Sequence, residues 1–428
     1  MKIISTASNF IREPLGSPMG FKGGYLSELW QSVARISTEN HTGVGVGVQS
    51  VLWSDASVFT GTSQAGGNAY MFAMTDYALN LIKGMEFTTP FDLLDAIFPK
   101  VYEYGKHITG NPNLRKTFAL NALVAVDNAA WQLYANIHGT QDLLTLLPEA
   151  LRLPLAGKQE KLCSIPLVTY GMSIDDVKKL IDAGYFFLKV KIGSDPEKDG
   201  DREKMLAWDK ERLRQIHEAV KDMTTPYTES GHIPYYLDAN GRYDSKERLA
   251  ELLRYADQIG ALERIAIVEE PFPEELLVDV SDLPVRIAAD ESAHSVADVI
   301  ERIELGYTAI ALKPIAKTLS MTLKILRAAR ERNVPCFCAD LTVNPWMVDW
   351  NKNIAARIPP LPGIKLGIME SNGAQNYADW DRLRSYHPLY NKAGFLDPKD
   401  GIYQLDDSFY CCSGGIFSHA PYYAEQVK

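Results

Sequence analysis

Short β-type runs alternate with helical stretches between residues 163 and 372, and this alternation limits the possible folds more than any other feature. Strands that alternate with helices predict βαβ units and a parallel sheet. Eight such runs in about 210 residues match the size of a (β/α)₈ barrel of the TIM type. The runs are SIPLV, FLKVKIG, IPYYLDANG, IAIVEEPF, VRIAADES, AIALKP, VPCFCADL and GIKLGIMESN.

The segments on either side of this pattern read differently. In the first sixty residues, KIISTASNFI, WQSVARISTE and VGVGVQSVLW are typical of strands, and NHTG predicts a hairpin turn. GSPMGFKGGY at residues 16–25 reads as a Gly-rich loop. Residues 68–150 read as helices, of which FALNALVAVDNAAWQLYANIHG is apolar nearly all round and should be buried. Residues 400–428 lean towards β structure and should return to the N-terminal unit.

Composition and charge disfavour several classes of protein. The chain of 428 residues carries a net charge of −10, whereas nucleic-acid binding needs a basic face. It has no apolar run as long as a membrane span and no signal-peptide pattern at its start, so we expect a cytoplasmic protein without a membrane partner. The five cysteines are odd in number and include the adjacent Cys411 and Cys412, which argues against a disulfide framework. Zinc-ligand spacing is lacking around Cys336 and Cys338.

Charged residues stand at the end of each barrel strand from the second onward. In barrels of this kind, catalytic groups lie where the strands end and the following loops begin. We therefore expect these side chains to meet at one mouth of the barrel. In strand order they are Lys189 and Lys191, Asp238 followed by Asn240, Glu269 and Glu270, Asp290 and Glu291, Lys313, Asp340, and Glu370.

The two lysines of LKVK point to the same face of their strand because they are two residues apart. Taken alone, the segment also fits an antiparallel strand with one wet face. The charges on the neighbouring strands favour an enclosed site instead. There, each lysine should lower the pKa of the other, which would help one of them act as a base.

The carboxylates of Asp238, Glu269 and Asp290 follow three successive strands, one βα repeat apart. Three converging carboxylates repel one another unless a cation holds them, and all-oxygen ligation suits Mg²⁺. Each acid singly is also consistent with a helix N-cap or an acid in the first turn. Alternation along a strand turns Glu270 and Glu291 away from their neighbours, so we interpret them as supporting residues.

Together, the motifs LKVK, LDAN, VEEP, ADES and LKP, in this order, resemble the enolase superfamily. The chain is most similar to the branch of muconate-lactonizing enzymes and dipeptide epimerases. The resemblance implies an α/β fold: a modified (β/α)₇β barrel with an α+β capping domain built from both chain ends. The implied units are an N-terminal capping segment at 1–155, the barrel at 156–375, and a C-terminal segment at 376–428 that returns to the cap.

The same resemblance implies the chemistry of the site. One Mg²⁺ per subunit would bind Asp238, Glu269 and Asp290, and a proton α to a substrate carboxylate would be removed. Lys191 corresponds to the base on one face, Lys313 to the acid or base on the other, and Lys189 to a lysine that supports the carboxylate. The resemblance also implies a small-molecule carboxylate as substrate, and we expect a homo-oligomer.

Several reactions are compatible with these groups. Lysines on both faces favour a racemase or epimerase, but a dehydratase of a hydroxy or sugar acid, or a cycloisomerase, would use the same groups. A catalytically silent binding protein on the same fold is the alternative from another class. The mandelate-racemase-like branch is disfavoured because the stretch from His294 to His387 contains no other histidine for a His–Asp pair.

Substrate choice is the least constrained part of the interpretation. Dipeptide epimerases carry an Asp-x-Asp pair at the last strand, whereas this chain has Met369-Glu370-Ser371-Asn372. Glu370 is expected to meet a substrate ammonium or carboxylate, and Asp340 to orient Lys313, bind a substrate cation or cap a helix. We also expect the 16–25 loop and the 53–57 segment to close over the barrel, so that Met19, Phe21 and Trp53 touch substrate.

Overall fold

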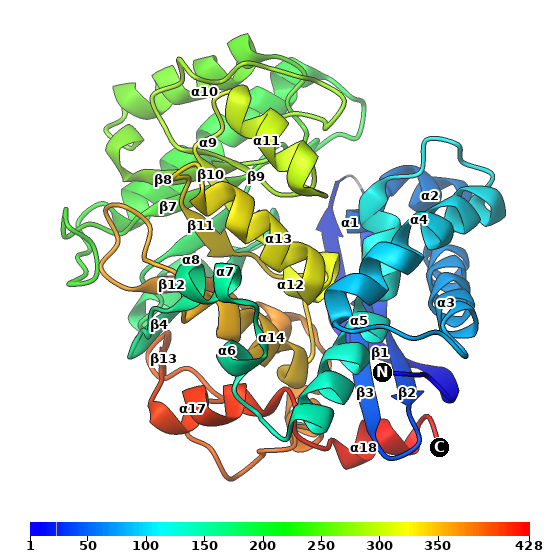
Figure 1. Cartoon of the computed structure of the whole chain (residues 1–428). Helices are drawn as coiled ribbons and strands as arrows, with labels where there is room; N and C mark the ends of the chain where they lie inside the picture. Colours follow the sequence, from blue (N-terminus) through cyan, green and yellow to red (C-terminus); the bar gives the residue numbers. More distant parts are fainter. Residues whose placement is uncertain (23) are drawn as a thin grey trace.

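The computed structural model describes residues 1–22 and 24–428, and a three-stranded antiparallel sheet forms its N-terminal end (Figure 1). The strands β1 (Ser5–Phe21), β2 (Gly24–Ser37) and β3 (Thr42–Gln49) pair in sequence order. The glycines of TGVGVGVQ let β3 lie directly on helix α5 (Lys116–His138). A Cβ on Gly43 or Gly45 would lie 2.1 Å from a backbone oxygen of α5. The alternating glycines therefore fix the helix against the sheet.

Two predictions for this region were wrong in detail. Residues 16–21 are not a loop, because β1 continues to Phe21 and β2 resumes at Gly24, which makes the glycine-rich stretch the tip of a long hairpin. Residues 51–54 form the short helix α1 (Val51–Ser54) rather than the end of a strand. A short apolar run of this kind is equally compatible with either structure.

Helices complete the N-terminal unit, and α5 is buried along almost its whole length, as its sequence predicts. In Figure 1, α5 runs between the N-terminal sheet and the barrel. The other helices of this unit are α2 (Ala56–Thr62), α3 (Gln64–Leu81), α4 (Pro90–Thr109), α6 (Leu143–Leu146), α7 (Glu149–Arg152) and a 3₁₀ turn at Leu153–Leu155.

The second sheet is the barrel. The segment 161–168 closes it: β4 (Lys161–Ile165) pairs with β12 (Gly367–Glu370), and after Pro166, β5 (Leu167–Val168) pairs with β6 (Leu188–Lys191). These two short strands act as one stave, which gives eight parallel staves in all. The remaining staves, in sheet order, are β7 (Tyr235–Asp238), β8 (Ile265–Glu269), β9 (Ile287–Ala289), β10 (Ala309–Leu312) and β11 (Cys336–Cys338).

Helices lie outside these staves and connect most of them. They are α8 (Ile174–Asp182), α9 (Arg202–Val220), α10 (Lys246–Gln258), a 3₁₀ turn at Leu262–Arg264, α11 (Val296–Glu304), α12 (Pro314–Lys317), α13 (Leu319–Arg330), α14 (Pro345–Ala355), α15 (Gly373–Asn376) and α16 (Trp380–Ser385). Within the described residues, none of the helices has both the length and the apolar character needed to cross a membrane.

The C-terminal segment contacts both units. Its strand β13 (Ile402–Gln404) pairs antiparallel with β4 of the barrel. Beyond it, α17 (Asp407–Cys412), a 3₁₀ turn at Ser413–Gly415 and α18 (Pro421–Glu425) follow, so residues 400–428 hold less strand than their composition suggested. The Asn9 side chain donates to the backbone oxygen of Gln426. The chain end therefore lies beside the N-terminal sheet, as Figure 1 shows.

Candidate active site

The strand-end residues meet in one pocket at the mouth of the barrel, which encloses about 400 Å³ of atom-free space. Glu269 and Glu370 are the last residues of β8 and β12, so their position follows directly from strand length. Glu270 and Glu291 line an adjoining pocket instead. The expected residues that line the main pocket are Met19, Phe21, Trp53, Lys189, Lys191, Asp238, Asn240, Glu269, Asp290, Lys313, Asp340 and Glu370.

Lys189 lies at the centre of the acidic groups. Its Nζ is 2.9 Å from Asp238, 3.1 Å from Glu269 and 2.9 Å from Glu370. Only 2% of the residue is exposed. The ammonium therefore neutralises carboxylates from three strands in a region that water scarcely reaches.

Lys191 and Lys313 stand on opposite sides of the pocket. They end or follow β6 and β10, which are four staves apart in a ring of eight. The Nζ of Lys191 is 2.6 Å from Asp238, and the Nζ of Lys313 is 2.5 Å from Asp290. A substrate between them would have an amine on each face.

The expected lowering of the lysine pKa was wrong for Lys189. Burial by itself would lower the pKa of Lys189, but Asp238, Glu269 and Glu370 outweigh it and raise the pKa well above its ordinary value. Burial would also lower the pKa of Lys313, but Asp290 and Glu269 together outweigh it and raise the pKa. The prediction weighed one lysine against another and left out the carboxylates that pair with them.

The acids of β7 to β9 offer oxygen ligands to a cation. Oxygens of Glu269, Asp290 and Glu291 lie within 4.8 Å of one another. Glu291 Oε2 is buried and accepts no hydrogen bond, whereas Asp290 Oδ1 lies 3.2 Å from the Nζ of Lys317. Burial raises the pKa of Glu269 to about 8 against the opposing effect of Lys189. A buried group of carboxylate oxygens from neighbouring strands fits Mg²⁺. The predicted ligand Asp238 accepts from both Lys189 and Lys191 at Oδ2.

The opposite half of the pocket is acidic but differently bonded. Asp340 accepts from the backbone N–H of Asn372 at 2.8 Å, and its own N–H donates to Glu370. Burial and the neighbouring Glu370 raise the pKa of Asp340 to about 7. The Asn372 amide donates to Glu370 and accepts from Thr342. Asp340 thus braces the loop after β12 rather than Lys313.

Side chains from the N-terminal unit cover the pocket at the barrel mouth. The Trp53 ring lies 4.4 Å from the Nζ of Lys313, and its indole N–H donates to Asp290 at 3.4 Å. Phe21 lies 5.6 Å from the Nζ of Lys191. Phe21 and Trp53, from the two segments expected to close over the barrel, therefore face its mouth, while residue 23 of the first segment lies outside the described residues.

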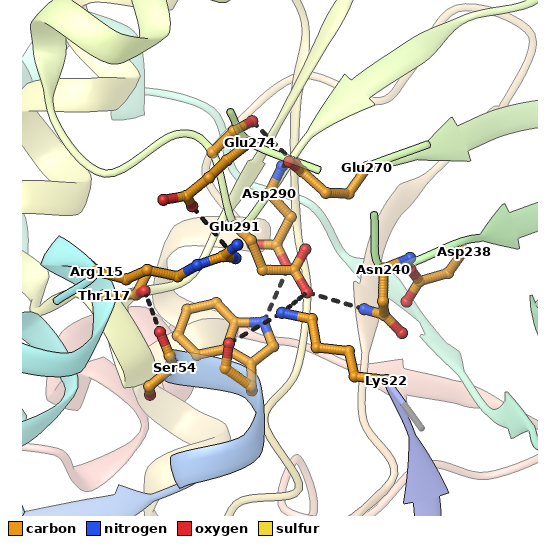
Figure 2. Close-up of polar contacts among 12 residues, drawn as sticks. Lys22, Ser54, Arg115, Thr117, Asp238, Asn240, Glu270, Glu274, Asp290 and Glu291 are labelled. Carbon is orange, nitrogen blue, oxygen red and sulfur yellow. Dashed lines mark hydrogen bonds and ion pairs between the residues drawn. The ribbon is translucent and has the colours of Figure 1, made fainter. Parts of the chain in front are cut away.

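Sequence reasoning missed two lysines. Lys317 lies one helical turn after Lys313, is buried, and its Nζ lies 2.5 Å from the Asp290 backbone oxygen and 3.2 Å from Oδ1. That spacing was a usable signal. The other is Lys22, which Figure 2 shows beside Glu291 and which also donates to the backbone oxygen of Trp53. Its partners lie far away in the sequence, so no local pattern indicates them.

Comparison with known proteins finds a family that resembles the barrel. Residues 173–372 match the enolase C-terminal domain-like family. In a search of curated proteins, none matches the chain. A dipeptide epimerase from Cytophaga hutchinsonii, solved with Mg and the dipeptide D-Ala-L-Val, is similar at 19% identity over 88% of each chain, with a TM-score of 0.63.

Two further solved structures share the fold over almost the whole chain. The N-succinyl Arg/Lys racemase from Bacillus cereus is 15% identical, with a TM-score of 0.64, over 95% of this chain and 93% of that one. A mandelate racemase/muconate lactonizing protein from Herpetosiphon aurantiacus is 18% identical, with a TM-score of 0.62, over 95% and 96% of the two chains. At these identities the likeness establishes the fold.

Proposed function

Since residues 173–372 match the enolase C-terminal domain-like family, we propose that the protein belongs to the enolase superfamily and is a racemase or epimerase of a small carboxylic acid. The observation that carries this proposal is the placement of Lys191 and Lys313 on opposite staves of one pocket. A stereocentre held between two amines can lose its proton to one and regain it from the other, which inverts its configuration.

Each side chain has a distinct task in this proposal. Lys191 and Lys313 exchange the α-proton at their Nζ atoms. Lys189, buried among carboxylates, provides fixed positive charge for the substrate carboxylate as charge develops on it. Bound by Asp238, Glu269 and Asp290, Mg²⁺ would supply further positive charge to the enediolate. Trp53 and Phe21 exclude water from the two amines.

The runner-up is a dehydratase of a hydroxy or sugar acid, in which one lysine protonates a leaving hydroxyl.

The side of the pocket that Asp340 and Glu370 line indicates which substrates fit. Asp340 and Glu370 are acidic and face the pocket, which favours a substrate with a hydrogen-bond donor or an amine remote from the carboxylate. This separates N-acyl amino acids and dipeptides from plain dicarboxylic acids, which such a wall would repel.

The experiment is proton exchange in D₂O. The protein with Mg²⁺ is incubated with dipeptides, N-acyl amino acids, proline derivatives and sugar acids, and deuterium at Cα is followed by NMR. We expect exchange with inversion. Loss of water would establish the dehydratase instead, and absence of exchange with every acid would leave a binding protein.

Single-lysine variants sharpen this test. Lys191→Ala and Lys313→Ala should each abolish racemisation, yet each should retain exchange of one enantiomer only, and of opposite enantiomers. Lys246→Ala is the matched control, because this lysine pairs with Asp282 on the outside of the barrel. If both variants lose exchange of the same enantiomer, the two-base assignment is wrong.

A further inference from the structure

The side chain of Lys22 is largely enclosed, although the residue lies in the turn at the tip of the β1–β2 hairpin. Only 8% of its side chain is exposed. Its Nζ is 2.9 Å from Glu291 Oε1 and donates to the backbone oxygen of Trp53 at 3.0 Å (Figure 2). We propose that Lys22 is a positioning residue that sets the geometry of both candidate catalytic lysines, an inference that rests on the proposed function.

The first connection runs to Lys191 through one amide. The Nδ2 of Asn240 donates to Glu291 Oε1 at 2.9 Å, and its Oδ1 accepts from Lys191 at 2.5 Å. A flipped amide would direct its N–H groups at the Lys191 ammonium and its oxygen at a carboxylate. Glu291 therefore decides which end of the amide Lys191 meets. Asn240 is also held in a left-handed backbone conformation, with φ of 45°, which aims it between these partners.

The second connection runs to Lys313 through Trp53. Lys22 holds the backbone of Trp53, while the ring of that residue lies over the Nζ of Lys313. The indole N–H donates to Asp290 Oδ2, and this oxygen also accepts from Lys313. A shift of α1 would therefore change the surroundings of Lys313 and of its carboxylate together.

Loss of the Lys22 charge has a clear electrostatic consequence. Glu291 is 2% exposed, and its Oε2 already accepts no hydrogen bond. Asp290 and Glu270 are further acidic groups close to Glu291, and Figure 2 shows all three on one side of the Lys22 ammonium. A buried carboxylate that loses its ion-pair partner is strongly destabilised, so it turns towards another donor or takes up a proton. The Asn240 amide would then lose the group that fixes it.

This role differs from substrate recognition. Met19 and Phe21 of the same hairpin line the main pocket, whereas Lys22 lines the adjoining one and faces Glu291. Its effect should therefore be the same for every substrate that the enzyme accepts. Loss of Lys22 should also affect proton transfer on both faces of the substrate, because the same ammonium contacts both Glu291 and the backbone of Trp53.

The kinetic test compares Lys22→Met with the wild type. Methionine keeps an unbranched apolar stem and removes the charge, and Lys22→Arg restores it. We expect the kcat of Lys22→Met to fall at least about tenfold in both directions, with KM changed far less, because small misplacements of reacting groups are costly. Lys22→Arg should recover part of the loss. Arg12→Ala is the control, since Arg12 pairs with Glu28 on the exposed part of the same hairpin.

A structural readout makes the test independent of any substrate. In crystals of Mg²⁺-loaded Lys22→Met, we expect the Asn240 amide to turn from Lys191 and the Trp53 ring to leave Lys313. An unmoved Asn240 and Trp53 would overturn the proposal. An unchanged kcat, or a raised KM for one substrate class alone, would also overturn it. If the exchange screen finds no substrate, the proposed function fails, but the crystal result still decides the positioning role.

Discussion

At the scale of single residues, Asp238 and Glu291 are the two candidates for the third cation ligand, beside Glu269 and Asp290. The sequence motif favours Asp238, whereas oxygens of Glu291, Glu269 and Asp290 lie within 4.8 Å of one another. Glu291 is already committed to Lys22 and Asn240 through Oε1. Asp238 contacts lysines that a divalent cation would displace from Oδ2 by charge alone.

We therefore predict that Asp238→Asn weakens Mg²⁺ binding much more than Glu291→Gln. In calorimetric titration, the Mg²⁺ affinity should fall more than about 100-fold for Asp238→Asn, as it should for Asp290→Asn. For Glu291→Gln it should fall less than about tenfold, because we expect Glu291 to support the ligands without binding the cation itself. The reverse order would assign the third position to Glu291. It would also mean that Lys22 must release Glu291 when the cation binds.

At the scale of elements, Asp209 joins the loops that follow β6 and β7. From helix α9 it accepts from the backbone N–H of Gly193 at 2.8 Å and from the hydroxyl of Tyr243 at 2.7 Å. Burial raises the pKa of Asp209 to about 7, although these donors favour the ionised form. The folded state thus keeps a proton that the unfolded chain, with an ordinary pKa of about 3.9, releases at lower pH.

Stability should accordingly fall as pH rises from about 4 to about 7, since the folded state binds more protons in that window. The difference is at most on the order of 4 kcal/mol for a shift of three units. Asp209→Asn, which cannot ionise, should flatten this part of the profile. Urea unfolding at pH 5 and pH 8 measures it, with exposed Asp175→Asn on α8 as the control. An unchanged difference in unfolding free energy between the two pH values would refute the assignment.

The elements also show how far sequence alone could reach. The strand-end charges were predictable because each stands next to its own strand, and a barrel brings strand ends together. The long hairpin was not predictable. The Gly-rich sequence GSPMGFKGGY is typical of a loop, and its extended conformation depends on the pairing of β1 with β2. The raised pKa of Lys189 was not predictable either, because it depends on three carboxylates from separate staves. Lys22 gave no local signal, since its partner Glu291 lies on β9's loop.

At the scale of the whole molecule, the N-terminal unit and the barrel share a buried polar contact. Ser320, in the first turn of α13, donates from its hydroxyl and its backbone N–H to Asp127 of α5, at 2.6 Å and 3.1 Å. The same hydroxyl accepts from the indole of Trp131 at 2.9 Å. Burial raises the pKa of Asp127 to about 6 against these bonds. Because α5 also packs against the N-terminal sheet, this contact couples the two units that line the pocket.

We predict that Ser320→Ala destabilises the entire chain by about 2 to 4 kcal/mol, since it leaves a buried indole N–H and one carboxylate oxygen without partners. Ser408→Ala, which removes an exposed hydroxyl bonded to Asp406, should cost less than about 0.5 kcal/mol. Denaturant unfolding gives the free energies, and hydrogen exchange by mass spectrometry locates the effect. Amides of β3 and α5 should lose protection together with those of β10 and β11, because a shared contact makes both units unfold as one. Faster exchange confined to the N-terminal unit would show that the cap opens independently of the barrel, and the pocket would then assemble only when the two units meet.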